Sequence, residues 1–274
     1  MSYAFLKGHG TENDFVLLPD HDGTTHGDLS ADRVRAICDR RAGIGGDGVL
    51  RVVRSQEVDE AQAETAEWFM DYRNADGGAS EMCGNGIRVF AVHLAQEGLV
   101  DPARPVHIGT RDGVKTVTLD GDAVTVDLGR PTVLAETEVS VAGRAWRATH
   151  VDLGNPHAVA FVDDLADAGG LLEGPAYDAS VYPSGVNVEF VARRGDRHVA
   201  MRVHERGVGE TRSCGTGAGA VLVATAVADG HRSGGEAAYR VDVPGGRLEL
   251  TWTSDDRVLL TGPAVVVARG TTSL

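Results

Sequence analysis

Lysine is nearly absent from this 274-residue chain, which contains it only as Lys7 and Lys115. Pyridoxal phosphate is held through a Schiff-base lysine in a prepared pocket, so this scarcity disfavours chemistry based on that cofactor. The sequence also lacks a GxGxxG turn opening a helix and a GxxxxGK[ST] phosphate loop. We therefore expect the protein's own side chains to carry its chemistry, with no cofactor.

Cysteine is scarce as well, and its three positions, Cys38, Cys83 and Cys214, are scattered along the chain. No CxxC pair and no His/Cys cluster at metal-ligand spacing is present. An odd number of isolated cysteines argues against a disulfide framework and against a structural zinc site. We expect no bound metal.

Positive charge and long hydrophobic runs are also lacking. The chain has 26 basic and 40 acidic residues, and its net charge of −14 would repel phosphate backbones and anionic membranes. The longest uncharged run, residues 213–228, is too short and too interrupted by glycine to span a bilayer. The N-terminus has no basic region followed by an apolar one. The sequence thus predicts a cytoplasmic protein that binds neither nucleic acid nor membranes.

What the sequence does contain is an internal repeat. The segment NADGGASEMCGNG, residues 74–86, resembles ERGVGETRSCGTG, residues 205–217, with the cysteines at the same place. Each is followed by an apolar segment of helical length that ends near Gly98 or Gly230. Upstream, GTENDFVLL resembles LGNPHAVAFV, and IGGDGVLRVV resembles SGVNVEFVAR. The repeat indicates two similar halves.

Short alternating segments between the motifs predict strands. They are YAFLK, GVLRVVR, VKTVTL and AVTVDL in the first half and AWRATHV, HVAMRVHE, YRVDV and RLELTW in the second. The segment after Cys214 has no charged residue before Asp229, and a short helix that is apolar on every side must be surrounded by protein. We predict an α/β (α+β-like) fold of two pseudo-symmetric halves. Each is a strand-rich, barrel-like sheet around a central helix, with the active site between the halves.

The predicted halves are residues 1–128 and 129–263, because Gly129 and Pro131 interrupt the strand pattern. Residues 264–274, within TGPAVVVARGTTSL, are expected to form a strand that returns to the first half. A further amphipathic helix, SADRVRAICDRR, has Ser30 as its N-cap and Gly43 just past its end. Cys38 lies on its apolar face, which favours a core position without a catalytic role. The acidic segment 54–67 is interpreted as a solvated loop without an assigned function.

In each half, the passage from cysteine into helix would direct unpaired backbone N–H groups and the positive end of the helix dipole at the thiol. Such surroundings lower a cysteine pKa. Gly84 and Gly215 would let a carboxylate approach the same N–H groups. If the halves face each other, two thiols flank one carboxylate-bearing carbon. This favours removal of an α-proton from one face and return of a proton on the other.

These motifs, in order and over nearly the whole chain, resemble those of the diaminopimelate epimerase family: GTENDF, GIGGDGV, NADG…MCGNG, GNPHAV, GVNVEF, ERGVGETRSCGTGA and TGPAVVV. The resemblance implies a cofactor-independent enzyme that converts LL-2,6-diaminopimelate, a small molecule, to its meso form for lysine and peptidoglycan synthesis. It also implies a homodimer. By this match Cys83 and Cys214 are the base and acid pair. Carboxylate at the reacting centre would be held by Gly84, Asn85, Gly215 and Thr216, and the remaining positions matched to substrate binding are Asn13, Asn74, Asn155, His157, Asn187, Glu205 and Arg206.

Physical chemistry supports part of this assignment independently. The distal end of diaminopimelate carries its own carboxylate and ammonium, for which Arg206 offers a fork and Glu205 an acceptor. Simpler interpretations exist for single residues: Asn85 as a turn former, His157 as a core histidine and Arg206 as a surface charge. Gly78, where a serine is common, and Gly48 depart from the family pattern at positions that affect only local backbone contacts.

The residues preceding the two thiols differ in charge. Glu81 stands two residues before Cys83, and Arg212 stands two residues before Cys214. We hypothesise from this asymmetry that Cys214 is the more acidic thiol.

Two alternative functions remain open at this stage. One is a proline or hydroxyproline racemase of the same fold, which has no distal amino-acid group to bind. The other is a thiol redox sensor in which Cys83 and Cys214 form a disulfide.

Overall fold

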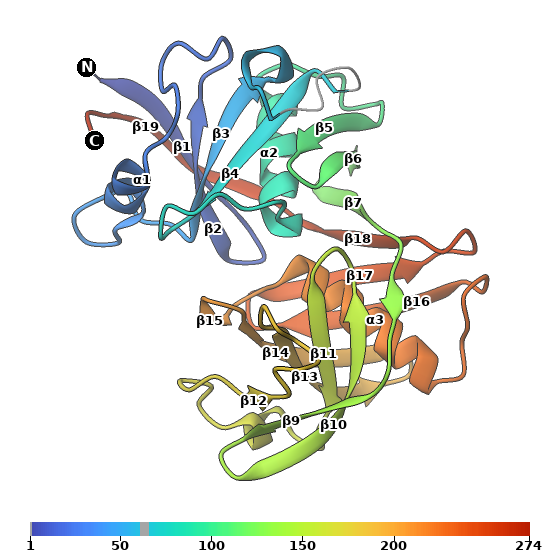
Figure 1. The fold of residues 1–274 in the computed structure, drawn as a ribbon. Helices are drawn as coiled ribbons and strands as arrows, with labels where there is room; N and C mark the ends of the chain where they lie inside the picture. The colour runs from blue at the N-terminus through green and yellow to red at the C-terminus, as the bar shows by residue number, and fades with distance from the viewer. Residues whose placement is uncertain (1, 61–65) are drawn as a thin grey trace. The chain divides into compact units, whose positions relative to one another are not determined.

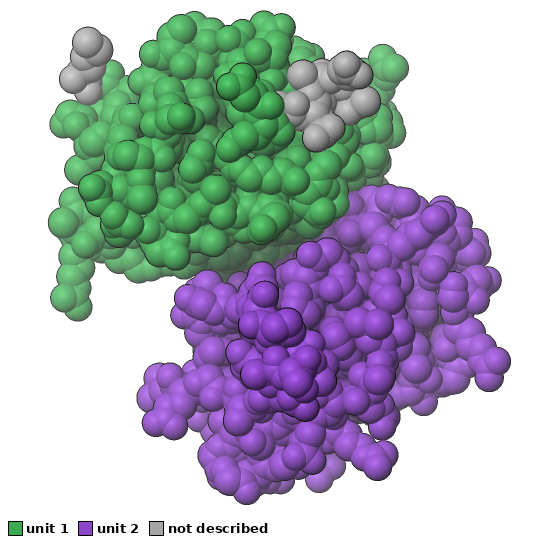
Figure 2. All heavy atoms as spheres, viewed as in Figure 1, with its two compact units in different colours: residues 1–126, 263–274 green, residues 127–262 purple. Residues whose placement is uncertain are grey.

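The repeat in the sequence reappears as a repeated strand order. In the computed structural model, which describes residues 2–60 and 66–274, the chain divides into unit 1 (residues 1–126 and 263–274) and unit 2 (residues 127–262). Figure 2 shows the two units in separate colours. The sequence analysis placed these boundaries after residues 128 and 263.

The strands of unit 1 are β1 (Tyr3–Gly10), β2 (Asn13–Pro19), β3 (Gly48–Arg54), β4 (Trp68–Asn74), β5 (Val106–Thr110), β6 (Gly113–Asp120), β7 (Ala123–Gly129, which crosses the boundary) and β19 (Val265–Thr272). They pair in the order β19–β1–β2–β3–β4–β5–β6–β7. The β2–β3 and β4–β5 pairs are parallel and the others antiparallel. Figure 1 shows the C-terminal β19 beside β1.

Unit 2 follows the same plan with β9 (Thr137–Val141), β10 (Arg144–Asp152), β11 (Pro156–Phe161), β13 (Asn187–Gly195), β14 (His198–Glu205), β16 (Ala237–Val243), β17 (Gly246–Trp252) and β18 (Val258–Pro263). They pair in this order, with β11–β13 and β14–β16 parallel and the others antiparallel. The short strands β8 (Thr132–Val133), β12 (Ala176–Tyr177) and β15 (Gly209–Thr211) add to β10, β9 and β14. The two units therefore share one sequence of parallel and antiparallel pairings.

In each unit the sheet packs around one buried helix, and this helix comes at the equivalent place in the strand order of the two units. Helix α2 (Gly84–Gln96) follows β4 and packs against β1, β2, β3, β4, β6 and β19 (Figure 1). Helix α3 (Gly215–Ala228) follows β14 and the short β15, and it packs against β10, β11, β13, β14, β16 and β17. Nearly all of α3 is buried, as its lack of charged residues predicted. Gly98 and Gly230 follow the helices with positive φ, the conformation expected of a helix-ending glycine.

The predicted fold class is confirmed: both units are strand-rich, with few helices. Helix α1 (Ala31–Cys38) begins at the predicted N-cap, where the Ser30 side chain accepts from the Arg33 N–H. The helix ends earlier than predicted, because Asp39 leaves the helical conformation and its carboxylate binds the N–H groups of Arg41 and Ala42. Cys38 is buried in the core, as predicted.

Two 3-10 turns complete the description, η1 (Ser55–Glu57) and η2 (Leu165–Ala168). Residues 61–65 of the predicted acidic loop lie outside the described residues. None of the helices in the described part of the chain combines the length and apolar character needed to span a membrane.

Candidate active site

Cys83 occupies the N-cap of α2, where the sequence analysis placed it. Its backbone is extended (φ −140°, ψ 118°), and its Sγ accepts from the Gly86 N–H at 3.4 Å. On the other side, Sγ lies 3.7 Å from Asn13 Oδ1. The thiol is thus half-buried at the positive end of a helix whose first N–H groups have no partner within the helix.

Cys214 occupies the equivalent N-cap of α3 with nearly the same backbone (φ −121°, ψ 118°). Its Sγ accepts from the Gly217 N–H at 3.4 Å and lies 3.7 Å from Thr216 Oγ1. The residue is only 8% exposed. The internal repeat therefore reproduces the same sulfur-capped helix start in both units.

The electrostatics of Cys214 correct the sequence analysis. Burial raises the pKa of the Cys214 thiol well above its usual range, and the carboxylates of Glu205 and Glu189 raise it further. The hydrogen bonds from Gly217 and Thr216 act in the opposite direction but are outweighed. The expectation that the helix end lowers the pKa of the Cys214 thiol is therefore wrong. The same effects oppose the hypothesis, drawn from Glu81 and Arg212, that Cys214 is the more acidic of the two thiols. The Arg212 guanidinium donates to the Pro244 carbonyl oxygen.

Two further predicted residues of unit 1 lie against Cys83. Asn13, at the start of β2, donates to Asp47 Oδ2 at 2.7 Å, which directs its Oδ1 toward Cys83. The same Oδ1 accepts from Asn85 Nδ2 at 3.1 Å, and Asn85 is fully buried. Gly84 is the first residue of α2.

Asn74, the fourth predicted binding residue of unit 1, ends β4. Its side chain accepts from the Tyr72 hydroxyl at 2.6 Å. The hydrogen bonds of Asn74 to Tyr72, Gly77 and Gly78 lead to its own strand and turn, and none of these bonds reaches Cys83.

In unit 2, a line of hydrogen bonds connects predicted residues to Cys214. His157 Nε2 lies 3.0 Å from Asn155 Oδ1, and Asn155 Nδ2 lies 3.3 Å from Thr216 Oγ1. Thr216, the second residue of α3 after Gly215, contacts the sulfur. These residues therefore surround the start of α3.

The predicted distal group of unit 2 lies at the end of β14. Glu205 ends this strand and accepts from the Thr211 hydroxyl. The Arg206 N–H donates to Asn187 Oδ1 at 2.9 Å, while its guanidinium donates to the Ser184 carbonyl oxygen at 3.3 Å. Arg206 is exposed, so its guanidinium remains open to an anion.

Two buried charged residues beside the thiols were missed by sequence reasoning. Arg88, in the second turn of α2, is fully buried, and so is Glu189 in β13. Glu189 Oε1 lies 2.7 Å from His157 Nδ1. A charged side chain within an apolar stretch, IRVF or NVEFV, was the available signal.

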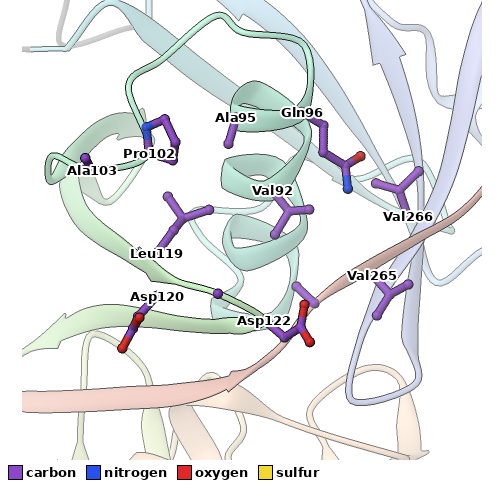
Figure 3. A pocket seen from close by; sticks show the side chains of 12 residues that line it. Val92, Ala95, Gln96, Pro102, Ala103, Leu119, Asp120, Asp122, Val265 and Val266 are labelled. Atoms are coloured by element: carbon purple, nitrogen blue, oxygen red, sulfur yellow. The ribbon is translucent and has the colours of Figure 1, made fainter.

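A pocket of about 520 Å³ lies elsewhere, along the second half of α2 and away from its sulfur-capped start. Figure 3 shows side chains from α2, β6 and β19 around it. It contains none of the predicted site residues. All three cysteines are free thiols, and in residues 2–60 and 66–274 no cluster of three His, Cys, Asp or Glu side chains could hold a metal.

Comparison with known proteins agrees with the repeated motifs. The family model for diaminopimelate epimerase matches residues 5–134 and 149–267. The chain belongs to the diaminopimelate epimerase family. It is 58% identical over 276 residues to the diaminopimelate epimerase of Streptomyces coelicolor, covering 97% of this chain and 94% of that protein. The corresponding enzyme of Corynebacterium glutamicum is 46% identical, with 98% of each chain covered.

The fold extends beyond this family. A phenazine biosynthesis protein of the PhzF family from Bacillus anthracis aligns over 100% of both chains with a TM-score of 0.70 and 16% identity. At that identity the likeness concerns the fold alone. Membership in the diaminopimelate epimerase family rests on the sequence.

Proposed function

We propose that the protein is an enzyme that epimerises LL-2,6-diaminopimelate to meso-diaminopimelate, with Cys83 and Cys214 as the base and acid pair. The observation that carries the proposal is the pair of sulfur-capped helix starts, each with the sulfur 3.4 Å from an N–H of the first turn. The membership in the diaminopimelate epimerase family supports the substrate. Its product serves lysine and peptidoglycan synthesis.

The mechanism requires both sulfurs to reach one α-carbon. A thiolate takes the α-proton and becomes a thiol, while the opposite thiol donates its proton to the other face and becomes a thiolate. The electron pair left by the first proton is delocalised into the α-carboxylate before the second proton arrives. N–H groups at the helix starts, next to Gly84 and Gly215, would stabilise the negative charge that builds up on that carboxylate. No external oxidant or electron sink is needed.

Recognition of the second amino-acid group is assigned to the residues at the end of β14. The exposed guanidinium of Arg206 would bind the distal carboxylate through paired hydrogen bonds. Glu205 and the amide oxygen of Asn187, which accepts from the Arg206 N–H, would accept from the ammonium group. This requirement separates the proposal from a proline racemase, whose substrate has no second head group.

The proposal extends to assembly and location. We infer a cytoplasmic homodimer that works without cofactor or metal and binds neither nucleic acid nor membranes. The net charge of −14 supports the last two points. Sedimentation equilibrium at micromolar concentration would show a dimeric mass if the assembly is as proposed.

Hydrogen exchange at the α-carbon tests the reaction itself. Wild-type enzyme with LL-diaminopimelate in D₂O should yield the meso isomer with deuterium at the inverted centre, read by mass spectrometry and chiral chromatography. Cys83→Ala and Cys214→Ala should each lower kcat for epimerisation by at least about 10²-fold, because each removes one proton-transfer group. Cys38→Ala, the matched control, should retain activity because Cys38 lies in the core.

Several outcomes would contradict the proposal. If the wild-type enzyme exchanges no α-hydrogen with solvent, the two-base mechanism is wrong and the redox-sensor function is favoured. If the enzyme racemises proline and leaves diaminopimelate unchanged, the two-base mechanism stands but the substrate is that of a proline racemase.

A further inference from the structure

Arg88 is a buried cation at the start of α2, the helix that Cys83 caps. Its Nη1 donates to the Gly84 carbonyl oxygen at 3.1 Å, and its Nη2 donates to Thr11 Oγ1 at 3.2 Å. Its Nε has no hydrogen-bond partner, and among the described residues no carboxylate lies within ion-pair distance of the guanidinium. An arginine fully removed from water normally has an anionic partner. Burial lowers the pKa of Arg88 to about 10, and the nearby Cys83 sulfur acts in the opposite direction.

Unit 2 places the opposite charge beside its thiol. The residue at the place of Arg88 after Cys214 is Gly219, and a Cβ there would come within 2.8 Å of Leu153. The buried charge near Cys214 comes from the sheet instead, as Glu189. A Cβ on Gly217 would lie 2.6 Å from Glu189 Oε1 and 3.2 Å from Cys214 Sγ. The carboxylate and the sulfur thus approach the same point of the first turn of α3.

Glu189 is held rigidly in this place. Its Oε1 binds His157 Nδ1 at 2.7 Å, both side chains are completely buried, and Oε2 has no hydrogen-bond partner. A buried carboxylate with an unpartnered oxygen keeps much of its negative potential. This potential favours the neutral, protonated form of a nearby thiol.

Other charged groups around the two thiols do not remove this difference. Cys83 faces Asn13 Oδ1, which favours a thiol, and beyond it Asp47, which is paired with Arg40. Cys214 faces a second carboxylate, Glu205, which adds to the effect of Glu189. The Arg88 guanidinium, which donates to the carbonyl oxygen of Gly84, the residue after Cys83, brings a positive charge to this helix start and favours the thiolate.

We infer that Arg88 and Glu189 are positioning residues that give the two thiols opposite resting states, Cys83 as thiolate and Cys214 as thiol. The inference rests on the proposed function in one respect: it assigns Cys83 as the base and Cys214 as the acid for the isomer that binds the resting enzyme. The sequence repeat makes the two helix starts alike, and these two charges make them chemically different.

The pH dependence of alkylation tests the inference without substrate. The full-length protein is treated with iodoacetamide between pH 5 and 10, and peptide mass spectrometry reports the rate at each cysteine separately. In the wild type, the midpoint for Cys83 should lie below that for Cys214. Arg88→Met should raise the Cys83 midpoint by about one pH unit or more, with Arg88→Lys restoring much of the shift. Glu189→Gln should lower the Cys214 midpoint by a similar amount.

Each variant also serves as the control for the other. Arg88→Met should leave the Cys214 midpoint unchanged, and Glu189→Gln should leave that of Cys83 unchanged, which a general loss of folding would not do. Thr11→Val removes the hydrogen bond from Arg88 to Thr11 Oγ1 but keeps the cation, so the Cys83 midpoint should stay in place.

Three results would overturn the inference: a wild-type Cys214 midpoint below that of Cys83, an unchanged Cys83 midpoint in Arg88→Met, or equal shifts of both cysteines in either variant. If the midpoints behave as expected while diaminopimelate is not epimerised, the proposed function fails and the thiol states stand.

Discussion

Gly217 has no side chain, and this lets the buried carboxylate of Glu189 and the Cys214 sulfur both lie against the first turn of α3. Gly217→Ala would place a methyl group 2.6 Å from Glu189 Oε1, on a fully buried side chain that His157 holds in place. We expect the variant to lose about 1–3 kcal/mol of unfolding free energy, because overpacking outweighs the gain in helix propensity. Urea denaturation at neutral pH measures the change.

Gly86, the matching position in α2, is the control for this substitution. A Cβ there meets only side-chain atoms, with Leu50 Cδ2 at 3.2 Å and Phe15 Cζ at 3.5 Å, and both can shift slightly. Gly86→Ala should therefore change the unfolding free energy by less than about 1 kcal/mol. Equal losses in the two variants would contradict the special crowding at Gly217.

The residue scale is also where sequence reasoning failed most clearly. The neighbours of Cys214 along the chain suggested an acidic thiol, but burial raises its pKa, and so do the carboxylates of Glu205 and Glu189 on β14 and β13. Arg212 is close to Cys214 in sequence, and its guanidinium donates to the Pro244 carbonyl oxygen. A pKa depends on burial and on partners brought in by the fold, and neither can be derived from a local motif.

At the scale of elements, α2 carries a buried histidine whose protonation opposes folding. His93 is almost fully buried, and neither ring nitrogen has a hydrogen-bond partner. Burial lowers its pKa to about 4, below the value near 6.5 in the unfolded chain. The unfolded state then binds more protons between these values. The free energy of unfolding should therefore fall as the pH drops from about 6.5 to 4, by about 3 kcal/mol from His93.

His93→Leu separates this contribution from other acid effects. The variant should lose that part of the slope, measured as urea midpoints at pH 4.5, 5.5 and 7. His107→Gln, on an exposed position of β5, should keep the wild-type slope. Some slope remains in both, because burial also lowers the pKa of His26 to about 4. A His93→Leu profile parallel to the wild type would refute the argument.

Elements were predicted best where the pattern is strongly periodic or capped. The strands at Gly48–Arg54 and His198–Glu205 and the cap at Ser30 appear where the sequence placed them. The end of α1 did not, because Asp39 offers its carboxylate to the next backbone N–H groups and competes with the helix. The repeated cysteine motif predicted both helix starts, since the same residues recur in the same order at each.

At the scale of the molecule, the chain closes unit 1 only after completing unit 2. Its last strand, β19, pairs with β1 along nearly its full length, and Arg269 binds Glu97 and Gln96 at the end of α2. The sequence predicted this return from the apolar run near the C-terminus. The folding of unit 1 therefore depends on residues that lie more than a hundred positions after the rest of it.

Deleting residues 264–274 tests this dependence. The truncated chain would leave β1 without a partner on one side and uncover the face of α2 that β19 contacts. We expect the alkylation of Cys38 and Cys83, both in unit 1, to accelerate at least tenfold, while Cys214 in unit 2 keeps its wild-type rate. Removing only residues 273 and 274, which follow β19, should change none of the three rates. Acceleration at all three cysteines would mean that the two units unfold together, and that each needs the other to remain folded.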